Sequence, residues 1–336
     1  MRISVAKETA DGEKRVLLLP EEVGKLTDRG HEVIVEKNAG LNIHRYDRNY
    51  MDAGARVVSD RKELFGDTDM LVKLKSPTPQ EFDFLNNNIL FSMLHHSQNP
   101  KNVYHLGKRG ATAIEIESIF NDAGERLVDG TDMTGEVGVL YAVQHLQKMP
   151  QDATALILGY GRVGSGAINM CGKLGIKTKI LRREEYSDIT HFLKGKDLLI
   201  NAIAWPEEAR ENERYVVTKE MIDLLDKAAV VLDLSVDFPN PIQTCRPTGL
   251  SNPFYIEEGR VHIGIYGYPG LVPMSSTKRY SGQVLPLISE IAKNNGLEGL
   301  AERGDLGRFL AKAVVDPEEL NWRQYEPEEL TGSLIE

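Results

Sequence analysis

The sequence predicts an α/β protein with two doubly wound, parallel-sheet domains of the Rossmann type and a cleft between them. Its length of 336 residues is too great for one ordinary core and suits two domains. Short β-rich runs alternate with amphipathic segments, as strands and helices do in parallel sheets. Several runs, such as residues 89–91, are apolar at consecutive positions, which indicates strands buried on both faces.

The expected elements follow one another in a regular order. In the first 120 residues we expect strands over 3–7, 32–36, 55–58, 70–75, 88–94 and 111–117, with helices over 21–29, 80–85 and 102–109. A helix over 134–147 leads into a second set of strands over 153–158, 177–181, 197–200, 230–234 and 262–265. Two further helices are expected over 165–174 and 280–292. We therefore expect one domain from residues 1–130 with about 280–336, and a second from 131–279.

The composition indicates which classes of binding partner the protein is expected to lack. Lys and Arg number 40 against 50 Asp and Glu, a net charge of −10, which argues against nucleic acid or a membrane surface as a partner. The only cysteines, Cys171 and Cys245, lack the spacing of a metal site or a disulfide framework, so we expect no metal and a reducing setting. Charge comes too early at the N-terminus for a secretory signal, and no apolar run approaches the ~18 residues of a membrane span. These features predict a cytoplasmic protein.

One glycine-rich turn predicts a bound dinucleotide in the second domain. The run GYGRVG follows the apolar strand expected at 153–158 and opens a helix, whose N-terminus offers free N–H groups to phosphates. The first glycine permits the tight turn, the second lets pyrophosphate approach the backbone, and the third lets helix and strand pack closely. The alternative is a glycine-rich turn without a ligand. The expected cofactor-binding residues of the turn are Gly159, Gly161, Arg162, Val163 and Gly164.

Two arginines bear on the choice of cofactor. About 20 residues after the glycine turn, where an acidic residue usually holds the ribose 2′-hydroxyl, stand Arg182 and Arg183. Guanidinium groups bind a phosphate bidentately, so the pair favours NADP(H), with NAD(H) as the alternative. In that alternative both arginines are solvated, and Glu184 or Glu185 holds the hydroxyl.

Polar side chains follow successive strands of the first domain. Arg15 lies just beyond the first strand, Lys75 ends a later strand, and His95 and His96 end the next. Ligands of open α/β sheets lie outside the carboxyl ends of the strands, so we expect these groups to face one crevice. An arginine and a lysine suit the carboxylate of a small acid, and a histidine transfers protons near neutral pH. Each residue taken alone is more often structural, and it is their repetition that indicates a site.

A carboxylate in the second domain is a further candidate. Asp237 lies past the strand expected at 230–234 and is followed by a turn sequence. It suits a hydrogen bond from a substrate amine or from a cofactor hydroxyl. A purely turn-forming aspartate is equally consistent with this spacing.

With these residues in place, the sequence resembles the alanine dehydrogenase and pyridine nucleotide transhydrogenase family, which also contains opine-forming and saccharopine dehydrogenases. The resemblance runs from about residue 1 to 290. It is carried by the segments VAKE at 5–8, EKRV at 13–16, GHEV at 30–33, EKNAG at 36–40, VKLKSP at 72–77, LFSMLH at 90–95, MTGEVG at 133–138, GYGRVG at 159–164, DLSVD at 233–237, RPT at 246–248 and PGLVPMSST at 269–277.

The resemblance implies hydride exchange between NAD(P) and the α-carbon of an amino acid, through an imine of the 2-oxo acid. It implies that Arg15 and Lys75 hold the substrate carboxylate and carbonyl, that His95 is the acid/base, and that Asp237 orients the amine or water. Thr134 matches a residue that contacts the cofactor. The resemblance also implies a substrate domain interrupted by the dinucleotide domain, and a homo-oligomer.

Three features depart from alanine dehydrogenases and leave alternatives open. Arg182 and Arg183 stand where those enzymes usually have an aspartate, and the stretch 184–197 is shorter, as in opine-type members. Gly267 replaces an asparagine near the nicotinamide. The arginine pair resembles that of carboxyethylornithine synthase, an NADP-using member. An opine-type condensation of a 2-oxo acid with an amino acid is therefore the second hypothesis, and a non-catalytic dinucleotide sensor is the third.

Overall fold

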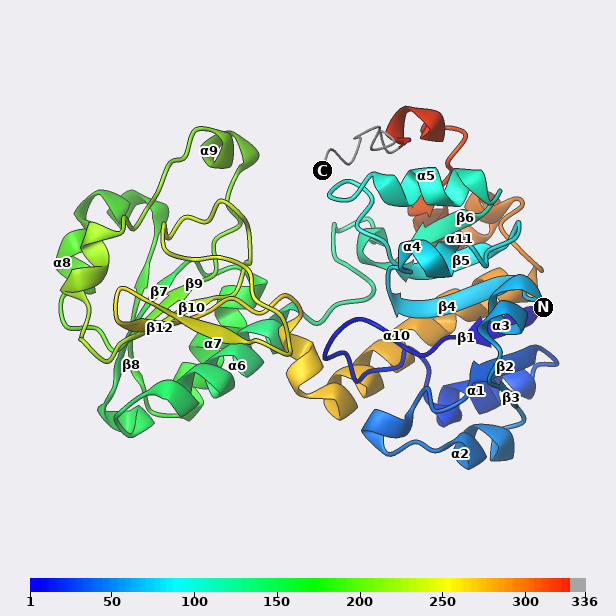
Figure 1. The fold of residues 1–336 in the computed structure, drawn as a ribbon, viewed down its shortest axis with the longest axis horizontal. Helices are drawn as coiled ribbons and strands as arrows, with labels where there is room; N and C mark the ends of the chain where they lie inside the picture. The colour runs from blue at the N-terminus through cyan, green and yellow to red at the C-terminus, as the bar shows by residue number, and fades with distance from the viewer. Residues whose placement is uncertain (327–336) are drawn as a thin grey trace, which may run out of the picture. The chain divides into compact units, whose positions relative to one another are not determined.

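The computed structural model describes residues 1–326 of the chain (Figure 1). These residues form two compact units. Unit 1 comprises Met1–Ala10, Lys14–Asp129 and the described residues from Thr277 onward, and unit 2 comprises Asp11–Glu13 and Gly130–Ser276. Each unit is a mostly parallel sheet with helices on its faces, so the predicted fold class is confirmed.

Unit 1 is built on a seven-stranded sheet, counted over the described residues. Six strands run parallel in the order β3-β2-β1-β4-β5-β6, and β13 pairs antiparallel with β6 at the edge. The strand order reverses between β1 and β4, which is where sheets of this kind bind ligands. The strands are β1 Arg2–Val5, β2 Glu32–Glu36, β3 Arg56–Val58, β4 Met70–Lys75, β5 Ile89–Met93, β6 Thr112–Glu115 and β13 Val314–Val315.

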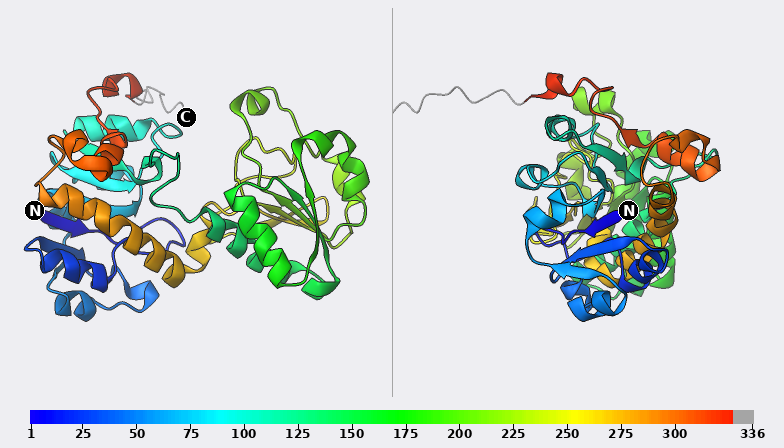
Figure 2. Two further views of the ribbon diagram at one scale, coloured as in Figure 1. Left: turned by 180° about the vertical axis from the view of Figure 1, so that it is seen from behind. Right: turned by 90° about the vertical axis from the view of Figure 1, so that its right-hand side faces the viewer.

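Helices cover both faces of the unit 1 sheet. Val35 and Val72 lie in a core with α1, α10 and α11, whereas Leu71 and Leu90 lie in a core with α3, α4 and α5. Figure 2 shows α10, in orange, running along the sheet. The helices are α1 Pro20–Thr27, α2 Asp47–Asp52, α3 Arg61–Gly66, α4 Pro79–Phe82, α5 Lys101–Lys108, α10 Pro273–Lys293 and α11 Gly304–Ala311.

Unit 2 is built on a six-stranded sheet, again counted over the part of the chain that the structure describes. Its parallel strands run in the order β8-β7-β9-β10-β12, and β11 pairs antiparallel with β12 at the edge. The order reverses between β7 and β9. The strands are β7 Thr154–Leu158, β8 Lys177–Leu181, β9 Leu198–Asn201, β10 Val230–Asp233, β11 Phe254–Glu257 and β12 Arg260–Ile263.

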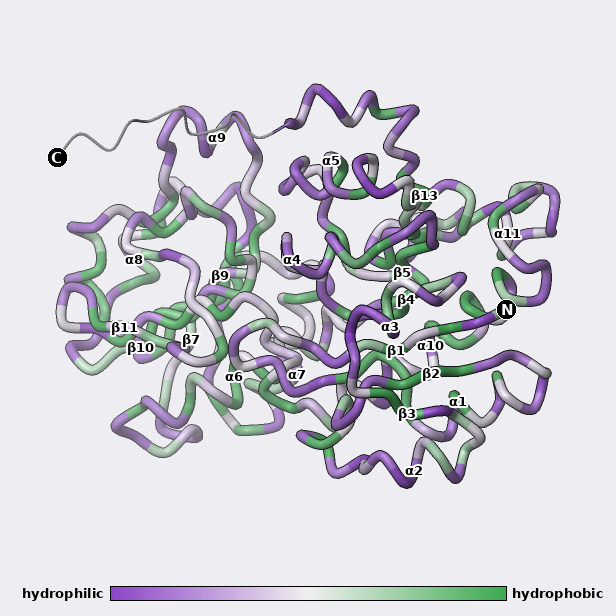
Figure 3. Tube along the Cα trace, turned by 45° about the vertical axis from the view of Figure 1, so that its right-hand side comes forward, coloured by the Kyte–Doolittle hydropathy of each residue, from purple (hydrophilic) through white to green (hydrophobic). Residues whose placement is uncertain are grey.

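The unit 2 sheet is also buried on both faces. Ala155 and Ile157 lie in a core with α6 and α7, and their neighbours Leu156 and Leu158 lie in a core with α8. Hydrophobic stretches of the trace accordingly follow strands in both units (Figure 3). The helices are α6 Thr131–Ala142, α7 Arg162–Lys173, α8 Ile189–Leu193 and α9 Glu207–Glu211.

The structure departs from the predicted elements at helix starts and at short segments. Helix α10 begins at Pro273 rather than near residue 280, because proline is well placed in a first helical turn. Helix α6 begins at Thr131 and ends at Ala142, earlier at both ends than expected. Helix α7 begins at Arg162 because Gly161 is its N-cap. The structure also contains five short helices and two edge strands that the sequence did not predict, namely α2, α3, α8, α9, α11, β11 and β13.

Candidate active site

The three glycines that lead from β7 into α7 are each suited to their position for a different physical reason. Gly159 has φ +90°, and a Cβ there would lie 2.8 Å from the carbonyl oxygen of Ala202. A Cβ on Gly164 would lie 2.6 Å from the carbonyl oxygen of Gly159, so the helix could not pack so closely on the turn. Gly161 has an ordinary φ of −64°, and a Cβ there would meet nothing within 4 Å. The protein's own packing thus requires Gly159 and Gly164 but not Gly161.

Helix α6 packs directly on the first turn of α7. A side chain at Gly135 would overlap the carbonyl of Val163, and one at Gly166 would overlap the carbonyl of Asp132. Close contact between the two backbones brings the N-terminal turn of α6 beside the glycine turn. Thr134 lies in that first stretch of α6, half-buried, and its hydroxyl donates to the carbonyl of Gly130 at 3.3 Å.

The arginine pair after β8 lies on the surface of unit 2. Arg182 and Arg183 are exposed, and the Arg182 guanidinium carbon lies 5.7 Å from the ring centroid of Tyr160, inside the glycine turn. Glu185, one of the two acidic alternatives, accepts from the backbone N–H of Arg182 at 2.9 Å and from Lys179 at 2.7 Å. The hydrogen bond from Lys179 lowers the pKa of Glu185 below its ordinary value. The Glu185 carboxylate therefore already has two local donors, Lys179 and the backbone of Arg182. The Arg182 side chain, in contrast, lies against Tyr160 of the glycine turn.

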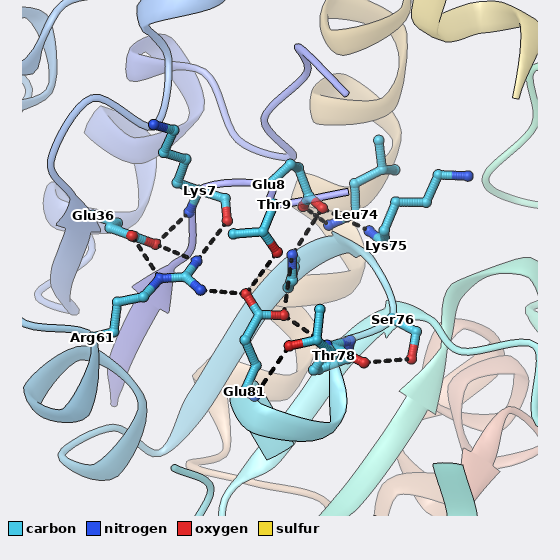
Figure 4. Close-up of polar contacts among 12 residues, drawn as sticks. Lys7, Glu8, Thr9, Glu36, Arg61, Leu74, Lys75, Ser76, Thr78 and Glu81 are labelled. Atoms are coloured by element: carbon cyan, nitrogen blue, oxygen red, sulfur yellow. Dashed lines mark hydrogen bonds and ion pairs between the residues drawn. The ribbon is translucent and has the colours of Figure 1, made fainter. Parts of the chain in front are cut away.

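In unit 1 the end of β4 is held by a buried carboxylate. The register between β4 and β5 shifts between Val72 and Lys75. Oε1 of Glu8 accepts from the N–H of Leu74 at 2.7 Å, and Oε2 accepts from the N–H of Lys75 at 3.3 Å. The ammonium of Lys73 lies 3.0 Å from Oε2 of Glu8, with both side chains only 1% exposed. In Figure 4 the side chain of Lys75 points away from the Glu8 carboxylate.

A second layer of charges surrounds this pair. Arg61 of α3 bonds Glu36 of β2 and Glu81 of α4, and Glu81 also lies 3.8 Å from the Lys73 ammonium (Figure 4). Glu81 forms a capping box with Thr78 at the start of α4. Burial alone raises the pKa of Glu81, but Lys73 and the hydrogen bonds from Thr78 and Arg61 outweigh it and lower that pKa. The network is thus charged and ties β1, β2 and β4 together at their carboxyl ends.

Arg15 lies in the segment that joins β1 to α1. It lies beyond β1 and is buried, and its guanidinium carbon is 5.9 Å from the ring centroid of Tyr280 in α10. A buried guanidinium suits an anionic ligand because it is always charged.

The two histidines after β5 are each held by a separate carboxylate. Oε1 of Glu117 accepts from the backbone N–H of His95 at 2.6 Å and lies 2.9 Å from its Nδ1. Oε1 of Glu115 accepts from the backbone N–H of His96 at 2.8 Å and lies 3.0 Å from its Nδ1. His95 has φ +49°, an uncommon conformation that the Glu117 contacts stabilise. Both rings are therefore fixed at Nδ1.

Glu115 differs from Glu117 in its surroundings. Burial alone raises the pKa of Glu115, but hydrogen bonds from Ser118 and His96 outweigh it and lower that pKa. Oε2 of Glu117 is buried and has no hydrogen-bond partner among the described residues. Since β4 and β5 are parallel neighbours, Lys75 and the histidines lie at one edge of the unit 1 sheet.

In unit 2, Asp237 lies on a loop that a buried aspartate organises. The carboxylate of Asp233 accepts from Asn201, from Asn240 and from the backbone N–H of Ser235. Burial raises the pKa of Asp233 to about 6, although these hydrogen bonds favour its charged form. The loop it anchors includes Val236 at φ +58°, a strained conformation for a β-branched residue. Strain of this kind is typical of functional loops.

The Asp237 side chain itself is half-buried and partnered. Its Oδ2 accepts from the backbone N–H of Trp205 at 2.8 Å, and its Oδ1 lies 4.0 Å from Nη1 of Arg210. Both partners belong to the loop after β9, the neighbour of the strand that carries the glycine turn.

Each unit thus gathers part of the predicted set. Unit 1 holds Lys75, His95 and His96 at the ends of β4 and β5, and Arg15 in the segment between β1 and α1. Unit 2 holds Thr134, the glycine turn, Arg182, Arg183 and Asp237. The sequence reasoning assigned no role to the partners of these residues. Glu8, Lys73 and Tyr160 had a signal, because they lie in quoted segments of the resemblance. The partners without such a signal are Glu81, Glu115, Glu117, Trp205 and Arg210.

The described residues hold neither a cluster suited to a metal ion nor a membrane-spanning helix. In residues 1–326 no group of three or more His, Cys, Asp or Glu side chains is arranged to hold a metal ion. No helix within that range is both long enough and apolar enough to cross a membrane.

Comparison with known families and proteins agrees with this geometry. The family model for the N-terminal domain of alanine dehydrogenase/PNT matches residues 4–134, and that for the C-terminal domain matches residues 181–312. The glycine turn falls between the two matched segments, so its interpretation as a dinucleotide-binding turn rests on its own geometry. Alanine dehydrogenase 1 of Staphylococcus aureus (strain N315) is 31% identical over 337 residues, which cover 89% of either chain.

Solved structures show the same fold. An L-alanine dehydrogenase superposes with a TM-score of 0.83 at 26% identity, covering 97% of this chain and 99% of that one. A transhydrogenase from Sinorhizobium meliloti superposes with a TM-score of 0.75 at 20% identity, covering 87% of this chain and 95% of that one. The chain is therefore an oxidoreductase with two Rossmann-type units. It belongs to the alanine dehydrogenase/PNT family.

Proposed function

We propose that this chain is an NAD(P)-dependent amino-acid dehydrogenase of the alanine dehydrogenase type. The bound nicotinamide supplies or accepts the hydride that is exchanged with the α-carbon of the amino acid, by way of the 2-oxo acid imine. The likeness to alanine dehydrogenases over nearly the whole chain supports an amino acid and a 2-oxo acid as the small-molecule substrates.

The observation that carries the proposal is the open space at Gly161. Glycine at this position is not required by backbone conformation or by packing. It fits a turn whose backbone must be approached by a phosphate. Together with Gly159, Arg162, Val163 and Gly164, it would hold the cofactor's pyrophosphate at the N-terminus of α7.

The strand-end residues of unit 1 suit the substrate chemistry. Arg15 and Lys75 are cationic donors for the substrate carboxylate and carbonyl. His95 is the acid/base: with Nδ1 held by Glu117, its proton exchange takes place at Nε2. A ring already fixed in orientation does not need to be ordered when the substrate arrives.

Asp237 and Thr134 complete the proposed assignment in unit 2. Asp237 orients the amine or the attacking water, since an ionised carboxylate accepts hydrogen bonds from either. Thr134 contacts the cofactor from the first turns of α6, beside the glycine turn. Asp237 follows β10 at the carboxyl end of the unit 2 sheet, and Thr134 lies in the helix that packs on the first turn of α7.

The proposed cofactor is NADP(H), with NAD(H) as the alternative. Arg182 is exposed and lies against Tyr160 of the glycine turn, while Glu185 is occupied by Lys179. Charge-assisted hydrogen bonds from Arg182 and Arg183 to a 2′-phosphate are worth about 1.5–3 kcal/mol, or roughly 10- to 150-fold in affinity.

Measuring kcat/KM with NADPH and NADH tests this choice. We expect a preference for NADPH in the wild type, flattened or reversed by Arg182→Asp with Arg183→Ser. A wild type that prefers NADH, with a ratio unchanged in the double variant, would mean that the arginines are surface charges.

A second candidate function is opine-type reductive condensation of a 2-oxo acid with an amino acid. The arginine pair and the glycine at Gly267 favour it, since both depart from alanine dehydrogenases. Steady-state oxidation of NAD(P)H with pyruvate separates the two functions. A rate with ammonia supports the dehydrogenase, a rate only with an amino acid as amine donor supports the condensation, and no rate with either contradicts both.

The state of the protein in the cell is part of the same proposal. We expect a homo-oligomer from the family likeness, without nucleic acid or membrane partners, and a cytoplasmic location. Sedimentation analysis of the purified protein tests the oligomeric state, and a monomer at working concentrations would contradict it.

A further inference from the structure

Asp237 is held at two points, by contacts that come from two different loops of unit 2. Its carboxylate oxygen Oδ2 accepts from the backbone N–H of Trp205, in the loop after β9, at 2.8 Å. Its backbone carbonyl accepts from Nδ2 of Asn240, in the loop after β10, at 3.2 Å. The direction of the Asp237 side chain therefore depends on the placement of both loops.

Both loops are tied to one carboxylate, that of Asp233, the last residue of β10. Its Oδ1 accepts from Nδ2 of Asn201 at 2.8 Å, and its Oδ2 accepts from Nδ2 of Asn240 at 2.7 Å. Asn201 ends β9, and its own Oδ1 accepts from the backbone N–H of Ile203 at 3.2 Å. The contacts thus close a circuit: one branch runs through Asn201 and the loop after β9, the other runs through Asn240, and both reach Asp237.

The three side chains of this circuit are shut off from water. Asn201 and Asp233 are 0% exposed, and Asn240 is 2% exposed. A buried carboxylate without donors is costly, so these hydrogen bonds cannot be given up for bonds to solvent. Bonds to an ionised acceptor are also roughly twice as strong as neutral ones. The circuit therefore holds the two loops in one arrangement.

The backbone on the approach to Asp237 is strained, and the same carboxylate supports it. Val236 has φ +58°, and Oδ1 of Asp233 also accepts from the N–H of Ser235 at 3.2 Å. A strained residue persists only where its surroundings over-determine its conformation, and such strain is one means of keeping a group aimed in advance. Here the strained residue directly precedes the carboxylate that we assign to the amine or water.

We propose that Asp233, Asn201 and Asn240 are positioning residues for Asp237 and that they act on the reaction only through it. The inference rests on the proposed function, in which Asp237 orients the amine or the attacking water. A carboxylate that is already aimed does not need to be ordered when the substrate arrives, and a misplacement of about 1 Å can lower the rate about 100-fold.

A double-mutant cycle in kcat tests the inference, with NADPH, pyruvate and the amine donor that gives a rate. We expect Asn240→Ala to lower kcat by about 10- to 100-fold, because the Asp237 carbonyl then loses its donor. The KM for NADPH should stay nearly unchanged, since the glycine turn is not part of the circuit. Measured at high enzyme concentration in an Asp237→Ala background, Asn240→Ala should cause no further loss, because residues that act through one group are not additive.

Asp233→Asn keeps the size of the side chain and tests the same bonds if Asn240→Ala does not fold. Whichever way its amide turns, one of the two asparagines loses its acceptor, so we expect the same loss of kcat and the same lack of additivity with Asp237→Ala.

Asp197→Asn is the matched control, because Asp197 is a buried aspartate at the amino end of β9, where it accepts from the backbone N–H and the hydroxyl of Thr154. It should lower stability and leave kcat nearly unchanged in either background. The inference is overturned if Asn240→Ala and Asp233→Asn keep the wild-type kcat, or if their losses are equally large without the Asp237 carboxylate. Those results leave the proposed function standing. A wild type that oxidises no NAD(P)H with any amine donor is a different result, which overturns the proposed function and the inference with it.

Discussion

His95 and His96 stand side by side with the same kind of anchor, yet the proposed reaction uses only one of them. Each ring is held at Nδ1 by a glutamate: Glu115 ends β6, and Glu117 lies in the 3-10 helix that follows it. We expect His95→Ala to lose activity by roughly 10²–10⁴-fold, the usual range for general acid–base catalysis, with cofactor affinity nearly unchanged. His96→Ala should lose far less. If steady-state rates show His96→Ala to be the more damaging change, the assignment at this strand end is wrong by one residue.

The buried pair of Lys73 and Glu8 governs stability at the end of β4. Removing one partner leaves the other charge buried and unpaired, which costs about 3–5 kcal/mol. We expect Lys73→Met to lower the free energy of unfolding in urea by an amount in that range. The double variant with Glu8→Leu should recover part of the loss, although the N–H of Leu74 then lacks its acceptor. A Lys73→Met protein as stable as the wild type would contradict this account of the network.

At the residue scale, strand ends were predictable but their partners were not. Lys75 and His95 stand where an apolar run stops, which a single sequence reveals. The partner of Lys73 is 65 residues away, and the partners of His95 and His96 are 22 and 19 residues away, at and just beyond the end of β6. Such pairs depend on strand order and register, which periodicity alone does not give.

At the scale of the βα turn, substitutions at two different glycines should affect ligand binding and folding separately. Gly161→Val places a side chain in open space, so we expect an unchanged melting temperature and loss of cofactor binding. Gly166→Val is the contrasting variant, because its side chain would overlap the carbonyl of Asp132 in α6. It should lower the melting temperature. Unchanged nucleotide affinity in a folded Gly161→Val protein, measured by calorimetry, would remove the main support for the dinucleotide site.

Among the elements, parallel strands were the easiest to predict. Their consecutive apolar residues follow from burial on both faces, as Leu156 and Ile157 show. The edge strands β11 and β13 were missed, since short strands exposed at an edge lack that signal. Helices α2, α3, α8 and α9 have five or six residues each, too few for a helical period to appear.

At the scale of the whole molecule, buried histidine links stability to pH. His262 is fully buried: its Nδ1–H donates to the carbonyl of Arg260, and its Nε2 accepts from Thr244. Burial lowers the pKa of His262 below its ordinary value. The unfolded chain therefore binds more protons as pH falls below about 6.5, and the free energy of unfolding decreases with falling pH.

Urea unfolding between pH 7.5 and pH 5.5 checks this expectation. The slope of unfolding free energy against pH should be smaller in His262→Phe, which keeps a ring to stack on Tyr255. Some slope should remain, because burial also lowers the pKa of His31, His105 and His145. An identical slope in the variant would show that His262 is not part of the pH dependence.

At the scale of the whole molecule, the reaction that we propose passes a hydride between a nicotinamide cofactor and the α-carbon of an amino acid. The direct measurement uses NADPH carrying deuterium at both C4 positions, with pyruvate and either ammonia or an amino acid as amine donor. Mass spectrometry of the product should find one deuterium, on the α-carbon derived from the 2-oxo acid. A product without deuterium, or cofactor binding with no product from any amine donor, would contradict the account.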